Sequence, residues 1–257
     1  MNKLVLMAVA AGFLTMVTAQ AQYTIISDNF TGPDGLSANG RLPDGINLPG
    51  SAWSAGTYWN PSIQNNTLSV GADTGVSISL ASSGSYVEPA GLIESVTFTE
   101  SSDTALGVGI GFGSAAVSPS GAYSYRSVFS GLVVTSSGSV QLWNQGSILD
   151  TVAWVGAAFD PNAACTMVYQ IDTTTGGFTS LSLTGDNADF TSLQTTAANN
   201  NVFSTADTQN AEIWGNGPSG GDTANFSDVE LTSTPEPGTL ALLGIGLAGT
   251  AVSSRRK

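Results

Sequence analysis

Acidic side chains are the main candidates for catalysis in this sequence, because it contains no histidine and a single cysteine. Without histidine, neither a histidine-assisted nucleophile nor a histidine-ligated metal site can form. Hydrolysis of a glycosidic bond needs two carboxylates about 5 to 9 Å apart. Glu94 and Glu100 share one face of a predicted strand, but six residues separate them by about 20 Å. Asp186 and Asp189 are close in sequence and are interpreted as a solvated turn, so we predict no catalytic residues.

The single cysteine, Cys165, lies in an alternating stretch. Cys165, Met167, Tyr169 and Ile171 share one face of the strand predicted over 165–173. A lone cysteine cannot form a disulfide within the chain. We therefore interpret Cys165 as a buried, inert thiol.

Aromatic residues are the other candidates for chemistry, since exposed rings can serve as platforms for a ligand. Trp53, Tyr58 and Trp59 cluster in the Gly- and Ser-rich stretch 51–59, and Trp143, Trp154 and Trp214 stand near predicted strand ends. Core packing is the first interpretation for each tryptophan. If a ligand platform exists, Tyr58 with Trp59 is the first candidate.

The charge of the central part of the chain excludes some ligands. Between residues 22 and 234 only Arg41 and Arg126 are basic, against 18 acidic residues, which gives a formal charge of −16. Such a surface repels phosphate groups, so we expect no binding to nucleic acid or to anionic lipid. Solubility is the simpler explanation, and calcium capture by carboxylates is the alternative. We predict no metal site and no cofactor, with calcium left as that alternative.

The first 21 residues have the three parts of a secretory signal peptide. Lys3 precedes an apolar run over 4–17, and Ala19 and Ala21 form the small-x-small pattern that signal peptidase accepts. With about 14 residues, the apolar run is shorter than the roughly 20 that span a bilayer. We expect residues 1–21 to be cleaved during export, with an uncleaved anchor as the alternative.

The C-terminal end combines three further elements. Pro235, Glu236 and Pro237 come first, an apolar stretch over 239–252 follows, and Arg255, Arg256 and Lys257 end the chain. The prolines keep the first element extended. The apolar stretch predicts a transmembrane helix whose basic tail stays on the cytoplasmic side.

This arrangement resembles the PEP-CTERM sorting signal, whose parts are a Pro-Glu-Pro motif, a short transmembrane helix and an Arg-rich terminus. The resemblance covers residues 234–257. It implies recognition by an exosortase, a membrane-embedded transpeptidase-like enzyme of Gram-negative bacteria, with cleavage at or near 235–237. The protein would be anchored in the membrane transiently and then reach the cell surface or an exopolysaccharide or biofilm matrix. A plain C-terminal anchor is the alternative.

Residues 22–233, between the two ends, predict one all-β domain. Alternating stretches separated by Gly, Ser and Asn turns predict strands over 92–100, 106–112, 127–135, 139–143, 147–154, 165–173, 178–184 and 225–232. In the first of these, Leu92, Glu94, Val96 and Phe98 share a face. The segment 188–206 is predicted to be a loop or one short helix. Many short strands in one domain favour an antiparallel β-sandwich.

The start and the end of this domain resemble concanavalin A-like lectin/glucanase (LamG-like) domains of secreted bacterial proteins. The resemblance lies in Asp-Asn-Phe at 28–30, Gly-Pro-Asp-Gly at 32–35, Asn-Gly-Arg at 39–41, Pro-Asp at 43–44 and the stretch 225–231. It implies a jelly roll of two large antiparallel sheets, with 225–231 as a closing strand near the first strand. The glucanases of this class carry their acids as E-x-D-x-x-E, which this sequence lacks. A carbohydrate-binding-module-like jelly roll and, more weakly, a parallel β-helix are the competing folds.

Two hypotheses from different classes follow. The leading one is a non-catalytic cell-surface or matrix protein, exported by the secretion machinery, processed by signal peptidase and an exosortase, and able to bind polysaccharide. Its rival is a secreted polysaccharide-active hydrolase whose acids are brought together by the fold. A structural matrix protein without a ligand is a third alternative.

Overall fold

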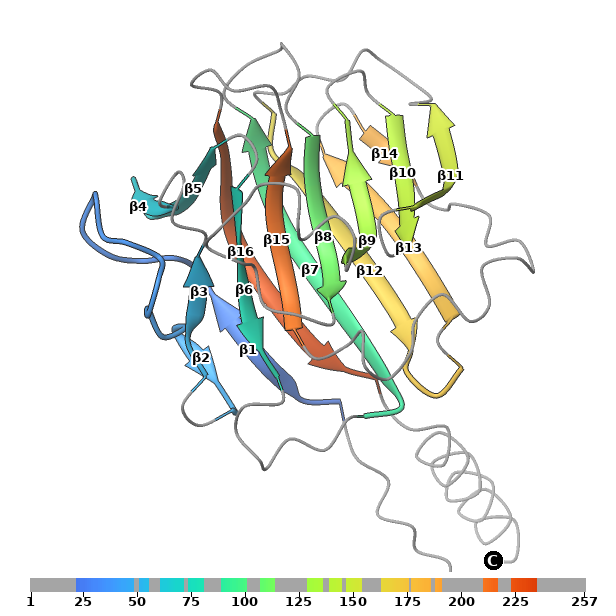
Figure 1. Cartoon of the computed structure of the whole chain (residues 1–257), viewed down its shortest axis with the longest axis horizontal. Coiled ribbons are helices and arrows are strands. Elements are labelled where there is room, and N and C mark those ends of the chain that lie inside the picture. Colours follow the sequence, from blue (N-terminus) through green and yellow to red (C-terminus); the bar gives the residue numbers. More distant parts are fainter. Residues whose placement is uncertain are drawn as a thin grey trace, which may run out of the picture. The chain divides into compact units, whose positions relative to one another are not determined.

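The computed structural model describes residues 22–48, 51–55, 61–71, 74–80, 89–100, 107–113, 129–135, 139–144, 147–153, 163–175, 177–185, 188–190, 210–216 and 223–234. Thr24–Ser233 form one compact unit, and every regular element described in it is a β-strand (Figure 1). The strands make two sheets in which every described pair is antiparallel. The all-β antiparallel sandwich predicted from the sequence is therefore confirmed.

The larger sheet, as far as it is described, contains nine strands. Seven follow the order β14-β13-β12-β7-β16-β1-β2, while β5 pairs with both β16 and β4. Their bounds are β1 Thr24–Asp28, β2 Gly45–Ile46, β4 Ser62–Gln64, β5 Thr67–Gly71, β7 Gly91–Glu100, β12 Cys165–Asp172, β13 Gly177–Gly185, β14 Ala188–Phe190 and β16 Thr223–Ser233. Because β16 lies between β7 and β1, the last strand of the sandwich pairs with the first. The predicted closing strand is therefore confirmed.

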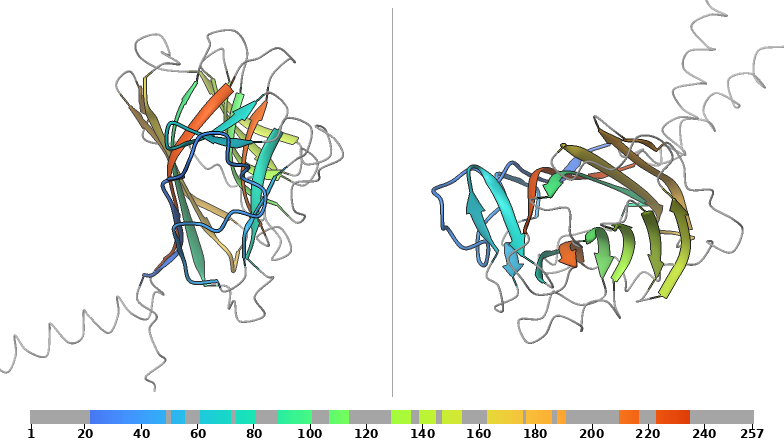
Figure 2. Two further views of the ribbon diagram at one scale, coloured as in Figure 1. Left: turned by 90° about the vertical axis from the view of Figure 1, so that its left-hand side faces the viewer. Right: turned by 90° about the horizontal axis from the view of Figure 1, so that it is seen from above.

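The second sheet has seven described strands in the order β11-β10-β9-β8-β15-β6-β3. Their bounds are β3 Trp53–Ala55, β6 Thr74–Ser79, β8 Gly107–Gly113, β9 Phe129–Val134, β10 Ser139–Asn144, β11 Ser147–Ala153 and β15 Asn210–Asn216. Seen from above, the two sheets form separate layers (Figure 2). The rings of Phe112 and Tyr169, one from each sheet, lie 5.9 Å apart and place the core between the layers.

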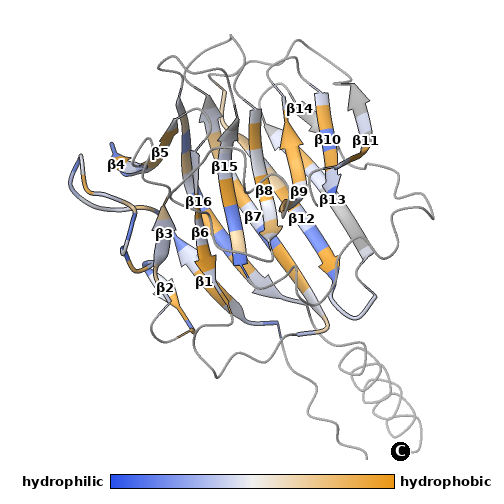
Figure 3. Ribbon diagram, in the orientation of Figure 1, coloured by the Kyte–Doolittle hydropathy of each residue, from blue (hydrophilic) through white to orange (hydrophobic). Residues whose placement is uncertain are grey.

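Alternation of apolar and polar residues explains the strands of the larger sheet, because successive side chains of a strand point to opposite faces. The β12 strand alternates strictly between buried and half-buried positions, and its change of hydropathy is visible in Figure 3. Cys165, Met167, Tyr169 and Ile171 are all buried on one face, as predicted. Along β7, Leu92, Val96 and Phe98 are buried together with Glu94, which confirms the predicted division of faces but leaves a carboxyl group inside.

Burial on both faces has different consequences for two strands of the smaller sheet. All seven residues of β8 are buried, but its alternation of Gly with Val, Ile and Phe predicts the strand over 106–112, which is confirmed. Asn210 to Gly215 of β15 are also all buried, and no strand is predicted there because the sequence shows no clear alternation of apolar and polar residues. The segment 188–206 was predicted as loop or helix, which is wrong for Ala188–Phe190, since these residues pair with β13 as β14. Asp189 therefore belongs to a strand and not to a turn.

Tight turns complete the N-terminal part of the unit. Asn65 and Asn66 connect β4 to β5, and both have positive φ values, of 52° and 58°. Two such residues in succession are typical of the type I′ hairpin turn, whose twist matches that of the strands. No helix within the described residues is long and apolar enough to cross a membrane. The helix predicted over 239–252 lies outside these residues, as does the predicted signal peptide.

Candidate functional site

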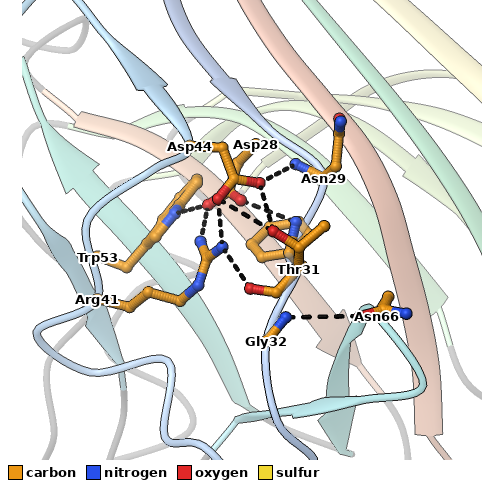
Figure 4. Close-up of polar contacts among 9 residues, drawn as sticks. Asp28, Asn29, Thr31, Gly32, Arg41, Asp44, Trp53 and Asn66 are labelled. Atoms are coloured by element: carbon orange, nitrogen blue, oxygen red, sulfur yellow. Dashed lines mark hydrogen bonds and ion pairs between the residues drawn. The ribbon is translucent and has the colours of Figure 1, made fainter.

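The best-connected polar cluster joins the motifs that open the domain (Figure 4). Asp28, at the end of β1, accepts hydrogen bonds from the Phe30 backbone N–H at 2.8 Å and from Trp53 Nε1 at 2.6 Å. Arg41 Nη1 forms an ion pair with the same carboxylate. Arg41 Nη2 donates to Asp44 at 2.9 Å and to the Thr31 carbonyl at 3.3 Å. Residues that are up to 25 positions apart therefore meet at one buried carboxylate.

The guanidinium group of Arg41 also contacts an aromatic ring of the segment 29–48. It lies 5.5 Å from the centre of the Phe30 ring, in cation–π geometry. Phe30 is fully buried and has a φ of 52°, a conformation that bulky residues rarely adopt. Its ring packs 5.8 Å from that of Trp53. The cluster therefore fixes the 29–48 segment against the sandwich.

Charge balance argues for a structural role of this cluster. Burial raises the pKa of Asp28, while the hydrogen bonds from Trp53 and Phe30 and the charge of Arg41 act in the opposite direction. Arg41 lies between Asp28 and Asp44, so the chain itself supplies the positive charge that the two carboxylates need. Among the described residues, no group of three or more His, Cys, Asp or Glu side chains could hold a metal ion.

Two buried glutamates, Glu94 and Glu212, have pKa values raised above the ordinary range. Glu94 of β7 is 1% exposed and Glu212 of β15 is 0% exposed. Within the described part of the chain, both carboxyl oxygens of Glu212 lack a hydrogen-bond partner, and so does Oε2 of Glu94. Burial raises the pKa of Glu212 to about 8. Burial and, secondarily, the charge of Glu212 hold the pKa of Glu94 well above its ordinary value.

The strand registers place these two carboxyl groups on different faces. Glu94 pairs with Tyr169, whose ring contacts Phe112 of the opposite sheet, so Glu94 faces the interior between the sheets. In the smaller sheet, Phe112 pairs with Ala211, and the next residue, Glu212, therefore points to the outer face. Glu94 and Glu212 consequently do not face each other across a common cleft.

The outer face of the smaller sheet is aromatic and buried. Trp214 contacts Phe129 at 5.3 Å and Trp143 at 6.2 Å, both edge to face.

Trp53, Trp143 and Trp214 are 2%, 8% and 1% exposed, so the prediction that they pack in buried positions is confirmed. Tyr58, Trp59 and Trp154 lie outside the described residues, and Tyr58 with Trp59 as a ligand platform stays a prediction.

The outer face of the larger sheet is different, because it is half-exposed and rich in hydroxyl groups. We call the described outward side chains of β5, β7, β12, β13 and residues 223–227 the hydroxyl face. One row across four strands consists of Thr184, Thr166, Thr97 and Ser227, and another of Thr99, Asn225 and Ser69. Thr97 and Thr166 share a hydrogen bond of 2.9 Å. Alternation had predicted these outward positions on β7, but their alignment into rows depends on the register.

The remaining predicted site residues belong to the terminal signals. Ala19 and Ala21, the predicted signal peptidase site, lie outside the described residues, as do Pro235, Glu236, Pro237, Arg255, Arg256 and Lys257. Their roles stay predictions.

Comparison with protein families bears on this C-terminal end. Residues 233–257 match the PEP-CTERM protein-sorting motif, so the predicted sorting signal is confirmed. This motif signals export and processing by an exosortase. A search of curated proteins finds no match.

Solved structures resemble the described sandwich. A protein of unknown function from Shewanella oneidensis MR-1, SO2946, aligns with a TM-score of 0.52 and 14% identity over 89% of this chain and 93% of its own. This likeness shows a shared fold. Lectin UEA-II complexed with galactose aligns with a TM-score of 0.48 and 10% identity over 84% of this chain and 99% of its own. Peanut lectin aligns with a TM-score of 0.48 and 13% identity over 84% and 98%.

Proposed function

We propose that this protein is an exported, exosortase-processed protein of the cell surface or extracellular matrix, and that its sandwich is not catalytic. One observation carries the proposal: the match to the sorting motif begins at residue 233, where β16 ends. All the described strands lie within the compact unit Thr24–Ser233, and none of them includes a residue from 235–257. Removal of the motif would leave these strands intact.

The acidic residues favour a non-catalytic domain. Hydrolysis of a glycosidic bond requires an acid and a second carboxylate on either side of the bond. Glu94 and Glu212 have pKa values raised by burial, yet they point to different faces and are both inaccessible. Asp28 is the other buried acid described, and it is occupied by Arg41 and Trp53.

The processing step can be tested with the full chain in a Gram-negative bacterium that has an exosortase and in the same strain without it. We expect the protein from the first strain to begin at Gln22, to lack Arg255 to Lys257 and to lie at the surface or in the medium. Without the exosortase it should stay in the membrane with its C-terminus intact. Intact-mass measurement of the purified protein distinguishes the two forms.

A matched pair of variants localises the signal. Pro235→Ala combined with Pro237→Ala should prevent C-terminal processing, because the extended peptide is lost. Glu230→Gln, an exposed change on β16, should be processed normally. Identical C-termini with and without the exosortase would contradict the proposal.

A further inference from the structure

The C-terminal end of β16 is held on both sides by neighbouring strands. Thr232 pairs with Ile93 of β7 and with Thr24 of β1. Ser233, the last residue of the strand, pairs with Leu92 of β7. Thr232 is 7% exposed and Ser233 is 1% exposed. The end of β16 is therefore built into the larger sheet and is not a loose terminus.

Very little chain separates this strand end from the sorting motif. Thr234 is the single residue between Ser233 and the Pro-Glu-Pro element at 235–237. Gly238 is the single residue between that element and the apolar stretch over 239–252 that is predicted to cross the membrane. Fully extended, the five residues 234–238 span at most about 18 Å.

That length leaves little room for an enzyme between the membrane and the sandwich. The headgroup layer of one leaflet takes about 5 to 8 Å of it. About 10 Å remain, which is the distance between two packed β-sheets. An enzyme that encloses the peptide can therefore place about one layer of secondary structure beside it.

Cleavage at 235–237 also needs extended peptide ahead of the cut. Extended peptides are bound largely through their main-chain N–H and C=O groups. On the amino-terminal side of the Pro-Glu-Pro element, only Thr234 lies between the element and β16. Thr232 and Ser233 belong to the ladders with β1 and β7, so their main chain is engaged with the sheet. An enzyme that binds these residues has to draw them out of β16.

We propose that opening of the C-terminal end of β16, at Thr232 and Ser233, limits the rate at which the exosortase processes this protein. The strand end must separate from β1 and β7 before each cut. Local opening of a paired strand costs free energy, so the open form is a minor fraction of the folded protein. The apparent affinity of the enzyme falls in proportion to that fraction. This inference rests on the proposed function and states how the same processing site is regulated.

The test measures how fast the full chain loses its C-terminus in cells that contain the exosortase, by pulse-chase labelling and separation of precursor from product. A Gly-Ser-Gly-Ser-Gly-Ser spacer inserted between Thr234 and Pro235 supplies flexible peptide, so β16 need not open. We expect this variant to be processed about tenfold faster or more, because a competent fraction of about a tenth or less no longer limits binding.

A disulfide tests the same strand end in the opposite direction. Thr24→Cys with Thr232→Cys places two thiols at a direct cross-strand pair, where Cα atoms lie about 4.5 to 5.5 Å apart and a disulfide fits. The oxidised variant should be processed about tenfold more slowly than the wild type or not at all. Dithiothreitol added to isolated membranes should restore the rate.

A second pair of cysteines is the matched control. Asn225→Cys with Ser69→Cys joins the other end of β16 to β5 and should leave processing within about twofold of the wild type, because that end need not open. Cys165 is buried and does not compete for either pair. Circular dichroism melting of the purified chains checks that every variant is folded.

The outcomes separate this inference from the proposed function. A folded spacer variant that is processed at the wild-type rate, or more slowly, would overturn the inference, because the enzyme would then need no opening of β16. Equal rates for the oxidised and the reduced Thr24→Cys/Thr232→Cys variant would also overturn it. In both cases the wild type is still processed, and the proposed function stands. Identical C-termini of the wild type with and without the exosortase would contradict the proposed function, and this inference with it.

Discussion

Individual buried carboxyl groups should make the stability of this sandwich depend on pH. Glu212 has no described hydrogen-bond partner, and its pKa of about 8 exceeds the ordinary value of 4.5. The folded state thus keeps its proton between these two values, while the unfolded state loses it. Stability should therefore fall as the pH rises from about 4.5 to about 8, by up to about 5 kcal/mol, and level off above that.

The corresponding variant is Glu212→Gln, which cannot ionise. Urea denaturation at several pH values between 5 and 8 should give a shallower pH dependence for Glu212→Gln than for the wild type. A residual slope from Glu94 should remain, since its pKa is also raised. Glu230→Gln, an exposed change, is the control and should behave as the wild type. Equal slopes for Glu212→Gln and the wild type would contradict the assignment.

Arg41 is the second residue on which stability depends. The substitution Arg41→Met would leave the fully buried carboxylate of Asp28 without a countercharge. Removal of one partner of a buried ion pair costs about 3 to 5 kcal/mol. Asp44→Asn is the matched control, because this carboxylate is 36% exposed and its pair should contribute at most about 1 kcal/mol. Chemical denaturation measures both, and similar losses for the two variants would disprove the central role of Asp28.

At the level of elements, close approach of strands constrains the smaller sheet. Gly111 and Gly131 pair directly between β8 and β9. A Cβ atom on Gly131 would lie 2.1 Å from the Ile110 carbonyl oxygen and 2.7 Å from Phe129 Cζ, so Gly131→Ala must displace backbone. Overpacking of this kind costs about 1 to 3 kcal/mol.

The control for that change is Gly32→Ala, whose Cβ would meet only Leu36 at 3.5 Å and Ile63 at 4.0 Å. It should shift stability by no more than about 0.5 kcal/mol. Thermal denaturation of both variants provides the comparison. A Gly131→Ala protein as stable as Gly32→Ala would mean that β8 and β9 are not in the described register.

Elements differed in how well the sequence predicted them. In β7 and β12 the described residues of one face are buried and those of the other are half-exposed, so alternation located both strands to within a few residues. In β15 the residues on both faces are buried, and in β1 the adjacent Ile25 and Ile26 are both buried beside a register shift. Neither strand shows the alternation of apolar and polar residues, with a period of two, by which a strand is predicted. The short strands β2, β3 and β4 have two or three residues each and depend on their pairing partners.

At the scale of the whole molecule, net charge affects association between copies, and strand connectivity decides when the sandwich is complete. The 18 acids between residues 22 and 234 disfavour association of two copies of the chain. The pairing of β1 with β16 joins the two ends of the compact unit. The sandwich is therefore complete only when its last strand is present, immediately before the sorting motif begins.

The sequence by itself determined the sorting signal, because this signal is a local order of residue types that needs no fold to be recognised. It also determined the all-β class and the inward side of Cys165, since both follow from local alternation. Tertiary structure decided that Asp28, Arg41 and Trp53 meet, that Glu94 and Glu212 face apart, and that Thr184, Thr166, Thr97 and Ser227 form one row. These relations join residues far apart in the chain. They depend on which strands pair and in which register, and local periodicity does not specify either.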